Sequence, residues 1–209
     1  IRQGYVKERT VCMNRIGSLL LEFGISLPKG HCKMRGLFSW LALQKCPLPP
    51  MLLQELVGQH EYYSLLSARI DEQNKKLIQL VEQHPLGALL KTIPGVGDMT
   101  ASLCIANISS ATDFKNGRNM AAWLGLVPRQ YSTGDRTILG RISKRGSKYL
   151  RTLFVQAAQI ILMRPHNWPK FSFGSWLEET SKRMHKNKLA TALANRLARI
   201  AWRILRSGK

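Results

Sequence analysis

Residues 89–108 read LLKTIPGVGDMTASLCIANI, with the PGVG turn at 94–97 at their centre. An apolar stretch that fits a helix meets a Gly-x-Gly turn and then a second such stretch, which predicts a helix-hairpin-helix over about 88–108. Glycine lacks Cβ, so the turn can take positive φ and approach another backbone closely. The N–H groups that open the second helix have no intrahelical partner and form a site for a phosphate.

A plainer interpretation of the same stretch is an ordinary corner between two helices, for which one glycine is enough. Under both interpretations Asp98 or Thr100 is expected to cap the second helix, because a short side chain with an oxygen accepts a hydrogen bond from a first-turn N–H. The phosphate-binding interpretation is the one that uses both glycines.

The charge of the chain is strongly one-sided. Its 209 residues include 32 Lys and Arg against 12 Asp and Glu, a net charge of +20. Between Phe114 and Leu177 the only acidic residue is Asp135, and none follows Thr180. This excess favours a polyanionic partner, and nucleic acid in particular. A basic amphipathic helix predicted at 186–205 could also lie on a membrane, but the rest of the chain favours nucleic acid, so no membrane partner is expected.

Two helices are predicted before the helix-hairpin-helix. The first covers 5–23 and stops at Gly24, and the second covers 51–83 and ends before Pro85. Apolar residues recur every seven positions in the second helix, a coiled-coil pattern. Its two seams are Leu56, Tyr63, Ile70 and Leu77, and Leu52, Gln59, Leu66, Gln73 and Leu80. The helix either forms a homo-oligomer through residues 51–83 or packs on its own domain.

The sequence after the turn predicts a helical domain with one irregular stretch. Helices are expected within 116–126, over 148–163 with Ser147 as the cap, and over 186–205, with a turn at 164–169. Residues 127–146 are rich in Gly, Ser, Thr and Arg and lack a helical period, so they predict a basic loop that can include short strands. The predicted fold class is mainly α, with a connector (1–50), a coiled-coil-like helix (51–84) and a C-terminal domain (85–209).

The four cysteines, Cys12, Cys32, Cys46 and Cys104, include no CxxC pair. The spacing of His31, Cys32 and Cys46 matches no zinc pattern, so no metal site is expected in this chain. Free thiols, the lack of a long apolar run and the lack of a signal peptide predict a cytoplasmic protein. The chain starts without Met within a predicted helix, so we expect a fragment of a longer protein.

Two kinds of phosphoryl chemistry could act on a nucleic-acid backbone. Metal-dependent cleavage needs clustered carboxylates, and the scattered acids of the basic half do not form such a cluster, so a two-metal nuclease is excluded for this chain alone. Attack by a hydroxyl is the other route, and it needs guanidinium or ammonium groups around the developing charge. Residues 129–136, RQYSTGDR, offer the hydroxyls Ser132 and Thr133 between two arginines. A polar loop that only contacts phosphate is the alternative.

Three blocks of sequence resemble the C-terminal domain of DEDD-type insertion-sequence transposases, the IS-one-ten and IS-eleven-eleven group. They are TIPGVGDMTASLCIANI, then FKNGRNMAAWLGLVPRQYSTG, then LGRISKRGSKYLRTLFVQAAQIIL. Residues 14–25, NRIGSLLLEFGI, resemble the segment that leads out of the family's RuvC-like domain. The resemblance therefore covers nearly the whole chain, in the family's block order.

The resemblance implies a two-part enzyme that recombines DNA as an oligomer and binds a structured guide RNA. An N-terminal RuvC-like domain would carry four acids for Mg²⁺, and these belong before Ile1, so this chain would bind no cofactor itself. The C-terminal domain would donate a serine nucleophile that directly precedes a glycine. Here that position is Thr133, before Gly134, and Ser132 stands one residue earlier. Because the methyl group of threonine crowds the attack, either Thr133 is a poorer nucleophile, Ser132 replaces it, or the copy is decayed.

The sequence therefore predicts the C-terminal portion of a DNA transposase that lies in the bacterial cytoplasm and associates with the nucleoid. Thr133 or Ser132 would attack a DNA phosphate, and DNA, guide RNA and a second copy of the chain are the expected partners. The residues expected to contact nucleic acid are Gly95, Val96, Gly97, Arg129, Arg136, Arg141, Lys144, Arg145 and Lys148. A catalytically inactive fragment that only binds nucleic acid is the first alternative, and a coiled-coil oligomerisation adaptor is the second.

Overall fold

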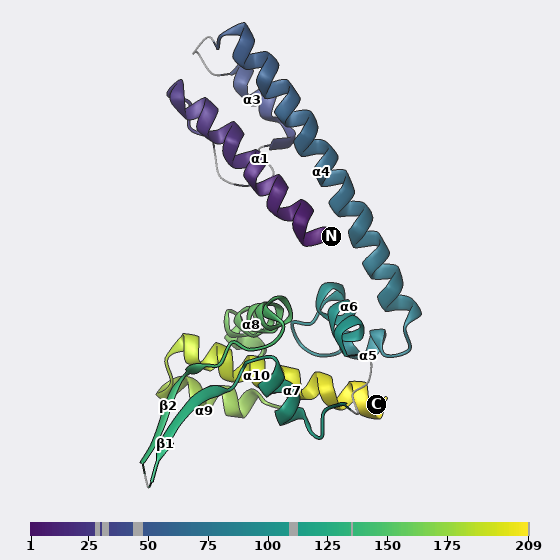
Figure 1. Cartoon of the computed structure of the whole chain (residues 1–209), viewed down its shortest axis with the longest axis vertical. Coiled ribbons are helices and arrows are strands. Elements are labelled where there is room, and N and C mark those ends of the chain that lie inside the picture. The colour runs from purple at the N-terminus through teal and green to yellow at the C-terminus, as the bar shows by residue number, and fades with distance from the viewer. Residues whose placement is uncertain (28–29, 31–33, 44–47, 109–112, 135, 209) are drawn as a thin grey trace. The chain divides into compact units, whose positions relative to one another are not determined.

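The computed structural model describes residues 1–27, 30, 34–43, 48–108, 113–134 and 136–208. The fold is mainly helical, and the described strands form one antiparallel hairpin (Figure 1). The chain divides into two compact units, Ile1–Lys76 and Leu77–Lys209. Each unit has a hydrophobic core of its own. In the described part of the chain no helix is long and apolar enough to cross a bilayer.

The first unit contains α1 (Arg2–Glu22), α3 (Leu37–Ala42) and most of α4 (Pro50–Gln83). α1 starts three residues before its predicted start and ends one residue before its predicted end. Gly24 has φ +74° and donates its N–H to the Leu21 carbonyl at 2.9 Å, while Ile25 donates to Leu20 at 3.0 Å. This pair of bonds is a Schellman motif, which needs a left-handed residue after the helix and therefore favours glycine.

Part of the predicted seam of α4 packs on α1 of the same chain. Leu56 and Tyr63 join α1 residues such as Cys12 and Ile16 in the core of the first unit. The Cys12 thiol donates to the Gln59 carbonyl at 3.2 Å, which ties the two helices together. Packing within one unit therefore accounts for Leu56 and Tyr63, and a homo-oligomer through 51–83 stays a prediction.

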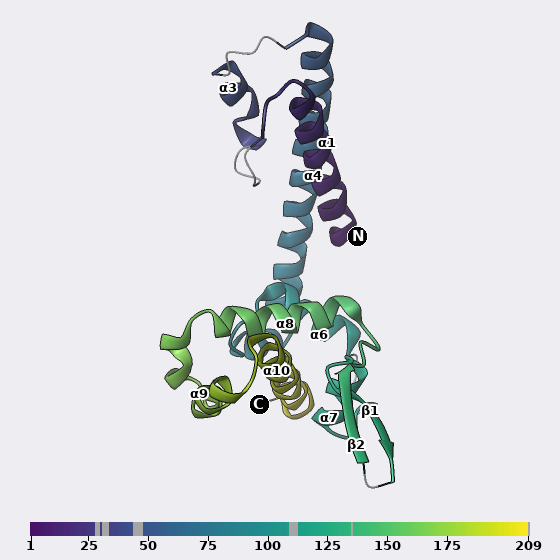
Figure 2. The same cartoon turned by 90° about the vertical axis from the view of Figure 1, so that its left-hand side faces the viewer.

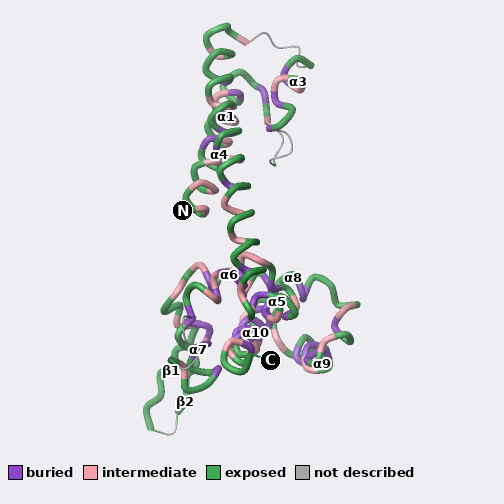
Figure 3. Tube along the Cα trace, turned by 90° about the vertical axis from the view of Figure 1, so that its right-hand side faces the viewer, coloured by how far each residue is buried: buried purple, intermediate pink, exposed green. Residues whose placement is uncertain are grey.

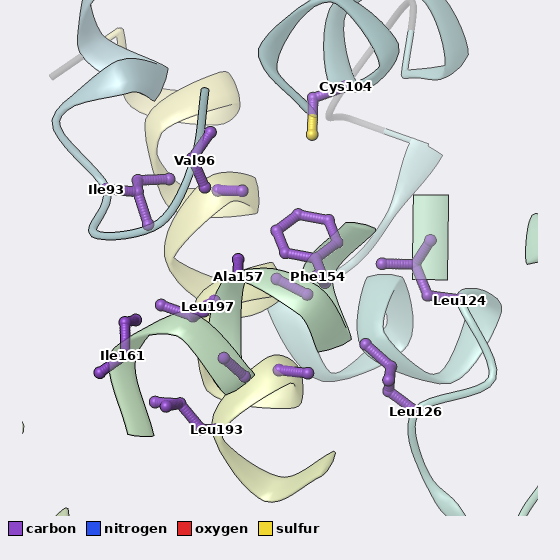
Figure 4. Packing of buried hydrophobic residues seen from close by; sticks show 14 of the residues in the cluster. Ile93, Val96, Cys104, Leu124, Leu126, Phe154, Ala157, Ile161, Leu193 and Leu197 are labelled. Carbon is purple, nitrogen blue, oxygen red and sulfur yellow. The ribbon is translucent and has the colours of Figure 1, made fainter. Parts of the chain in front are cut away.

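The second unit is built around two amphipathic helices, α8 and α10, and Figure 2 shows α8 lying across α10. Phe154, Ala157 and Ile161 of α8 meet Leu193 and Leu197 of α10 in its core (Figure 4). The remaining elements surround this pair. The bounds are α5 (Gly87–Lys91), α6 (Asp98–Asn107), α7 (Gly117–Trp123), β1 (Pro128–Thr133), β2 (Arg136–Ile142), α8 (Lys148–Leu162), the 3-10 helix η2 (Pro165–Lys170), α9 (Gly174–Arg183) and α10 (Lys186–Ser207).

Most helices predicted for this unit are present, with two corrections. Ser147 caps α8 as predicted, because its hydroxyl accepts the N–H of Leu150 at 3.3 Å. The stretch 127–146, predicted as a loop that can include short strands, is mostly a β-hairpin, and the turn predicted at 164–169 is η2. The helix α9 was not predicted, because few apolar residues mark its buried side.

Candidate nucleic-acid interface

The turn between α5 and α6 packs closely on α8. Gly95 has φ +76°, and a Cβ placed there would lie 2.9 Å from the carbonyl oxygen of Ala157. Val96 is buried in the core of the unit. Packing within the chain thus accounts for Gly95 and Val96. Gly97 differs, because its φ is −106° and nothing lies within 4 Å of a Cβ built on it, so only Gly97 keeps an open approach to a ligand.

The predicted side-chain cap of α6 is wrong. Gly97 is the N-cap residue, and no side chain caps the helix. Asp98 is instead the first helical residue, and its carboxylate forms an ion pair with Lys91 of α5 at 2.7 Å. The hydrogen bond and charge of Asp98 raise the pKa of Lys91 above its ordinary value. Thr100 lies in the first turn of the helix, where it is buried and makes no capping hydrogen bond.

The two glycines of this turn make a matched pair for mutagenesis. Gly95→Ala is expected to destabilise the chain by about 2–4 kcal/mol, because the new Cβ meets the α8 backbone in a left-handed conformation. Gly97→Ala is expected to cost at most about 1 kcal/mol, because Ala is a poorer N-cap residue than Gly, and yet to weaken DNA binding, because its Cβ occupies the space that a phosphate would use. Urea unfolding and DNA-binding anisotropy measure the two effects. A Gly97→Ala variant with unchanged DNA affinity would remove this turn from the interface.

The hairpin β1–β2 projects from the helices of the second unit, on the side away from α5 and α6 (Figure 1). All described strand residues except the half-buried Ile142 are exposed, on both faces (Figure 3). Thr133 pairs with Arg136 across the tight loop, where Gly134 has φ +57°. A two-stranded ribbon with so little buried surface gains little stability on its own, so its exposure points to a role in contacting a partner.

The register of the hairpin separates the two candidate hydroxyls. Successive strand residues point to opposite faces, and directly paired residues share a face. Thr133 therefore shares a face with its partner Arg136 and with Tyr131. Ser132 lies on the other face, opposite Thr137, where its hydroxyl accepts a hydrogen bond from the Gln130 amide at 2.8 Å. The register thus places Thr133, and not Ser132, on the same face of the hairpin as Arg136.

The base of the hairpin is held by contacts that the sequence alone did not indicate. Gly125 and Gly146 have φ +71° and +68°, and a Cβ on either would overlap backbone atoms, of Arg145 and Trp123 respectively. Arg151 is buried, and its guanidinium donates to the carbonyls of Leu124 at 2.9 Å and Arg145 at 2.8 Å. These contacts fix where both strands leave the helical core. The signal in the sequence is the pair of glycines that brackets the hairpin.

The predicted basic residues all lie on the hairpin or directly after it, and all are exposed. Arg129 is on β1, where its guanidinium reaches the Ser143 carbonyl at 3.5 Å. Lys144 has φ +56°, unusual for a residue with a side chain, and donates its N–H to Gly125 at 3.2 Å. The others are Arg136 and Arg141 on β2, Arg145 in the connection, and Lys148 at the start of α8. None of the six pairs with a carboxylate in the described part of the chain.

Metal-ligating and thiol chemistry have little support in the described residues. No group of three or more His, Cys, Asp or Glu there could hold a metal ion. His31, Cys32 and Cys46 lie outside the described residues. Cys104 sits in the core of the second unit, and burial raises the pKa of its thiol to about 12. It therefore stays protonated at neutral pH and is a packing residue.

The region that contains the α5–α6 turn and the hairpin is also the one that matches a known protein family. Residues 87–172 match the model of the Transposase IS116/IS110/IS902 family. Over its whole length the chain is 38% identical to the transposase for insertion sequence element IS1328 of Yersinia enterocolitica, of which it covers 61%. The chain belongs to the IS116/IS110/IS902 transposase family.

Two further proteins are similar to this chain. The transposase for insertion sequence element IS1111A of Coxiella burnetii is 32% identical over 98% of this chain and 56% of its own length. The pilin gene-inverting protein of Moraxella bovis is 26% identical over 68% of this chain and 44% of its own length. The chain spans less than two thirds of the length of these relatives. The matched transposase region includes both the α5–α6 turn and the hairpin.

Proposed function

We propose that this chain is the part of a DNA transposase that binds nucleic-acid backbone and supplies the attacking hydroxyl. The observation that carries the proposal is the exposed basic hairpin, with Thr133 directly opposite Arg136. Membership of a transposase family and similarity to a protein named for gene inversion support DNA as the substrate. The structured RNA implied by the family resemblance is part of the same proposal.

The proposed reaction is a transesterification at a DNA phosphate. The Thr133 Oγ1 forms a bond to phosphorus, one sugar oxygen leaves and takes up a proton, and the hydroxyl proton passes to solvent. The threonyl phosphoester keeps the bond energy for rejoining the strand. Arg136, which shares the face of Thr133, lies where it can stabilise the developing charge.

The other cations of the hairpin are proposed to hold the neighbouring backbone. Arg129 lies on β1 four residues before Thr133, about 13 Å along the strand. That spacing places Arg129 on a different phosphate from the one attacked, as a positioning contact. Lys144 and Arg145, at the base, extend this track toward α8. The Mg²⁺ of the reaction is assigned to carboxylates of another domain, and no step is assigned to a metal held by the residues described.

The binding part of this proposal is tested by the salt dependence of DNA affinity. For the chain as it stands, log affinity for a DNA duplex is expected to fall linearly with log salt. Arg136→Gln combined with Arg141→Gln should lower the slope by about 2, because two phosphate contacts are lost. Lys182→Gln, an exposed change on α9 outside the hairpin, is the control and should leave the slope unchanged. A slope that the hairpin pair does not alter would contradict the proposed interface.

A second function, nucleic-acid binding without strand transfer, is favoured by one observation. The family resemblance implies a serine before the glycine of the hairpin loop, and this chain has Thr133. A non-catalytic binder would pass the salt titration and form no covalent adduct with DNA. The adaptor alternative has less support, because α1 already covers Leu56 and Tyr63 of the α4 seam.

A further inference from the structure

A second basic surface of the chain lies away from the hairpin and the α5–α6 turn. It is a cavity of about 860 Å³ formed by the start of α7, by α9 and by the face of α10 that turns away from α8. Its lining includes four arginines and two tryptophans, namely Arg118, Trp176, Arg196, Arg199, Trp202 and Arg203. We call this surface the α7–α10 cleft.

The sequence of α10 builds one wall of this cleft. Its apolar residues Leu189, Leu193 and Leu197 are buried in the core. Arg196, Arg199 and Arg203 follow each other at intervals of three and four residues, so they form a stripe on a different side of the same helix. A Cβ on Gly117 would lie 3.2 Å from the Trp202 ring and 3.3 Å from the Arg199 backbone. The start of α7 therefore packs closely on α10 and brings Arg118 to the stripe.

The cleft has a concentrated positive charge without a protein counter-charge. No Asp or Glu lines it, and in the described part of the chain none of its four arginines pairs with a carboxylate. Guanidinium groups gathered in one concave site repel each other unless an anion binds between them. The charge therefore points to an anionic ligand with more than one charged group.

The aromatic side chains distinguish this cleft from a simple phosphate site. The Arg196 guanidinium lies over the Trp176 ring, 5.1 Å from its centroid, and 5.6 Å from that of Phe173. Trp176 is half-buried and lines the cavity, so part of its indole is accessible to a ligand. The ring of Trp202 also lines the cavity, and the Arg206 guanidinium lies 5.1 Å from its centroid. Arginines along a groove combined with aromatic rings are the arrangement that binds unpaired strands, since bases stack on the rings while phosphates meet the cations.

We propose that the α7–α10 cleft binds an unpaired strand of nucleic acid, with phosphates on Arg199 and Arg203 and a base stacked at Trp176. A duplex keeps its bases inside the helix and could use only the charge of the cleft. The site goes beyond the hairpin interface proposed above, because the two surfaces share no residue. The hairpin contacts the duplex that is cut, and the cleft holds a strand that has left its duplex or never had a partner.

The test measures the binding of labelled oligonucleotides of about 12 nucleotides, as (dT), (rU) and a duplex, by anisotropy. Arg199→Gln combined with Arg203→Gln should weaken single-strand binding by about tenfold or more and lower its salt slope by about 1.4. Duplex affinity should change by less than about threefold. Lys182→Gln combined with Lys188→Gln removes the same charge from exposed sites on α9 and α10 outside the cleft, and it should leave single-strand binding unchanged. Stronger loss for (rU) than for (dT) would identify RNA as the ligand, and the reverse would identify DNA.

Trp176→Leu separates stacking from charge. It should weaken single-strand binding by about tenfold with an unchanged salt slope, and thermal unfolding checks that the variant is folded. Equal losses for duplex and single strand in the arginine pair, or equal effects of the arginine and lysine pairs, would overturn the proposal. Those outcomes would leave the hairpin interface intact, because its variants are scored on duplex binding alone.

Discussion

Replacing Thr133 by alanine in a transposition-competent form of the protein is expected to lower strand transfer by about a thousandfold or more. Removal of an attacking group leaves only positioning and charge stabilisation, which do not replace it. DNA affinity should change by less than about twofold, because one exposed hydroxyl contributes little to a backbone interface. Recombination of a plasmid substrate measures the activity, and anisotropy measures the affinity.

Two variants serve as controls for this result. Ser132→Ala should keep activity within a few-fold, because Ser132 lies on the opposite face of the hairpin from Arg136. Thr133→Ser should be at least as active as the unmodified protein, since it keeps the hydroxyl and removes the methyl group that restricts χ1. Loss of activity in Ser132→Ala together with an active Thr133→Ala would place the nucleophile on the other face.

Gly146→Ala is expected to have the largest effect on stability, at least about 4 kcal/mol. Gly146 has φ +68°, which costs about 1–2 kcal/mol for a residue with Cβ. The new Cβ would also overlap the carbonyl oxygen of Trp123, so the connection to α8 must shift. Small domains are stable by only about 5–15 kcal/mol. This variant should therefore unfold at a much lower urea concentration than the unmodified chain.

Gly134→Ala is the matched control at the tip of the same hairpin. Its φ is +57°, yet nothing lies within 4 Å of a Cβ built there. The expected cost is therefore the backbone term alone, about 1–2 kcal/mol. Equal losses in the free energy of unfolding at the two positions would show that the backbone at Trp123 moves to make room for the new Cβ. That result would contradict a fixed hairpin base.

The helices were predictable where burial on one side imposes a period on the sequence. The spacing of Leu189, Leu193 and Leu197 predicts α10, and the cap residue Ser147 predicts the start of α8. The hairpin imposes no such pattern, because both of its faces are exposed and no buried face requires apolar residues at every second position. The prediction of a side-chain cap on α6 was wrong for a different reason. Asp98 pairs with Lys91, which lies seven residues earlier in the sequence.

The candidate site was predictable in its residues but not in its geometry. The segment 129–136 stands out for its hydroxyls and arginines, yet only the strand register separates Thr133 from Ser132. Gly95 shows the converse, because a glycine that fits a phosphate turn is used to pack on Ala157. The α7–α10 cleft could not be foreseen, since its arginines come from α7 and α10, about eighty residues apart in the chain.

The most direct test of the proposed reaction is to map the residue that becomes joined to DNA. A transposition-competent form of the protein is incubated with a labelled DNA substrate, stopped under denaturing conditions, digested and analysed by mass spectrometry. We expect a nucleotide linked through phosphate to Thr133. A nucleotide on Ser132 or on any other residue, or strand transfer without a protein–DNA adduct, would contradict the assignment.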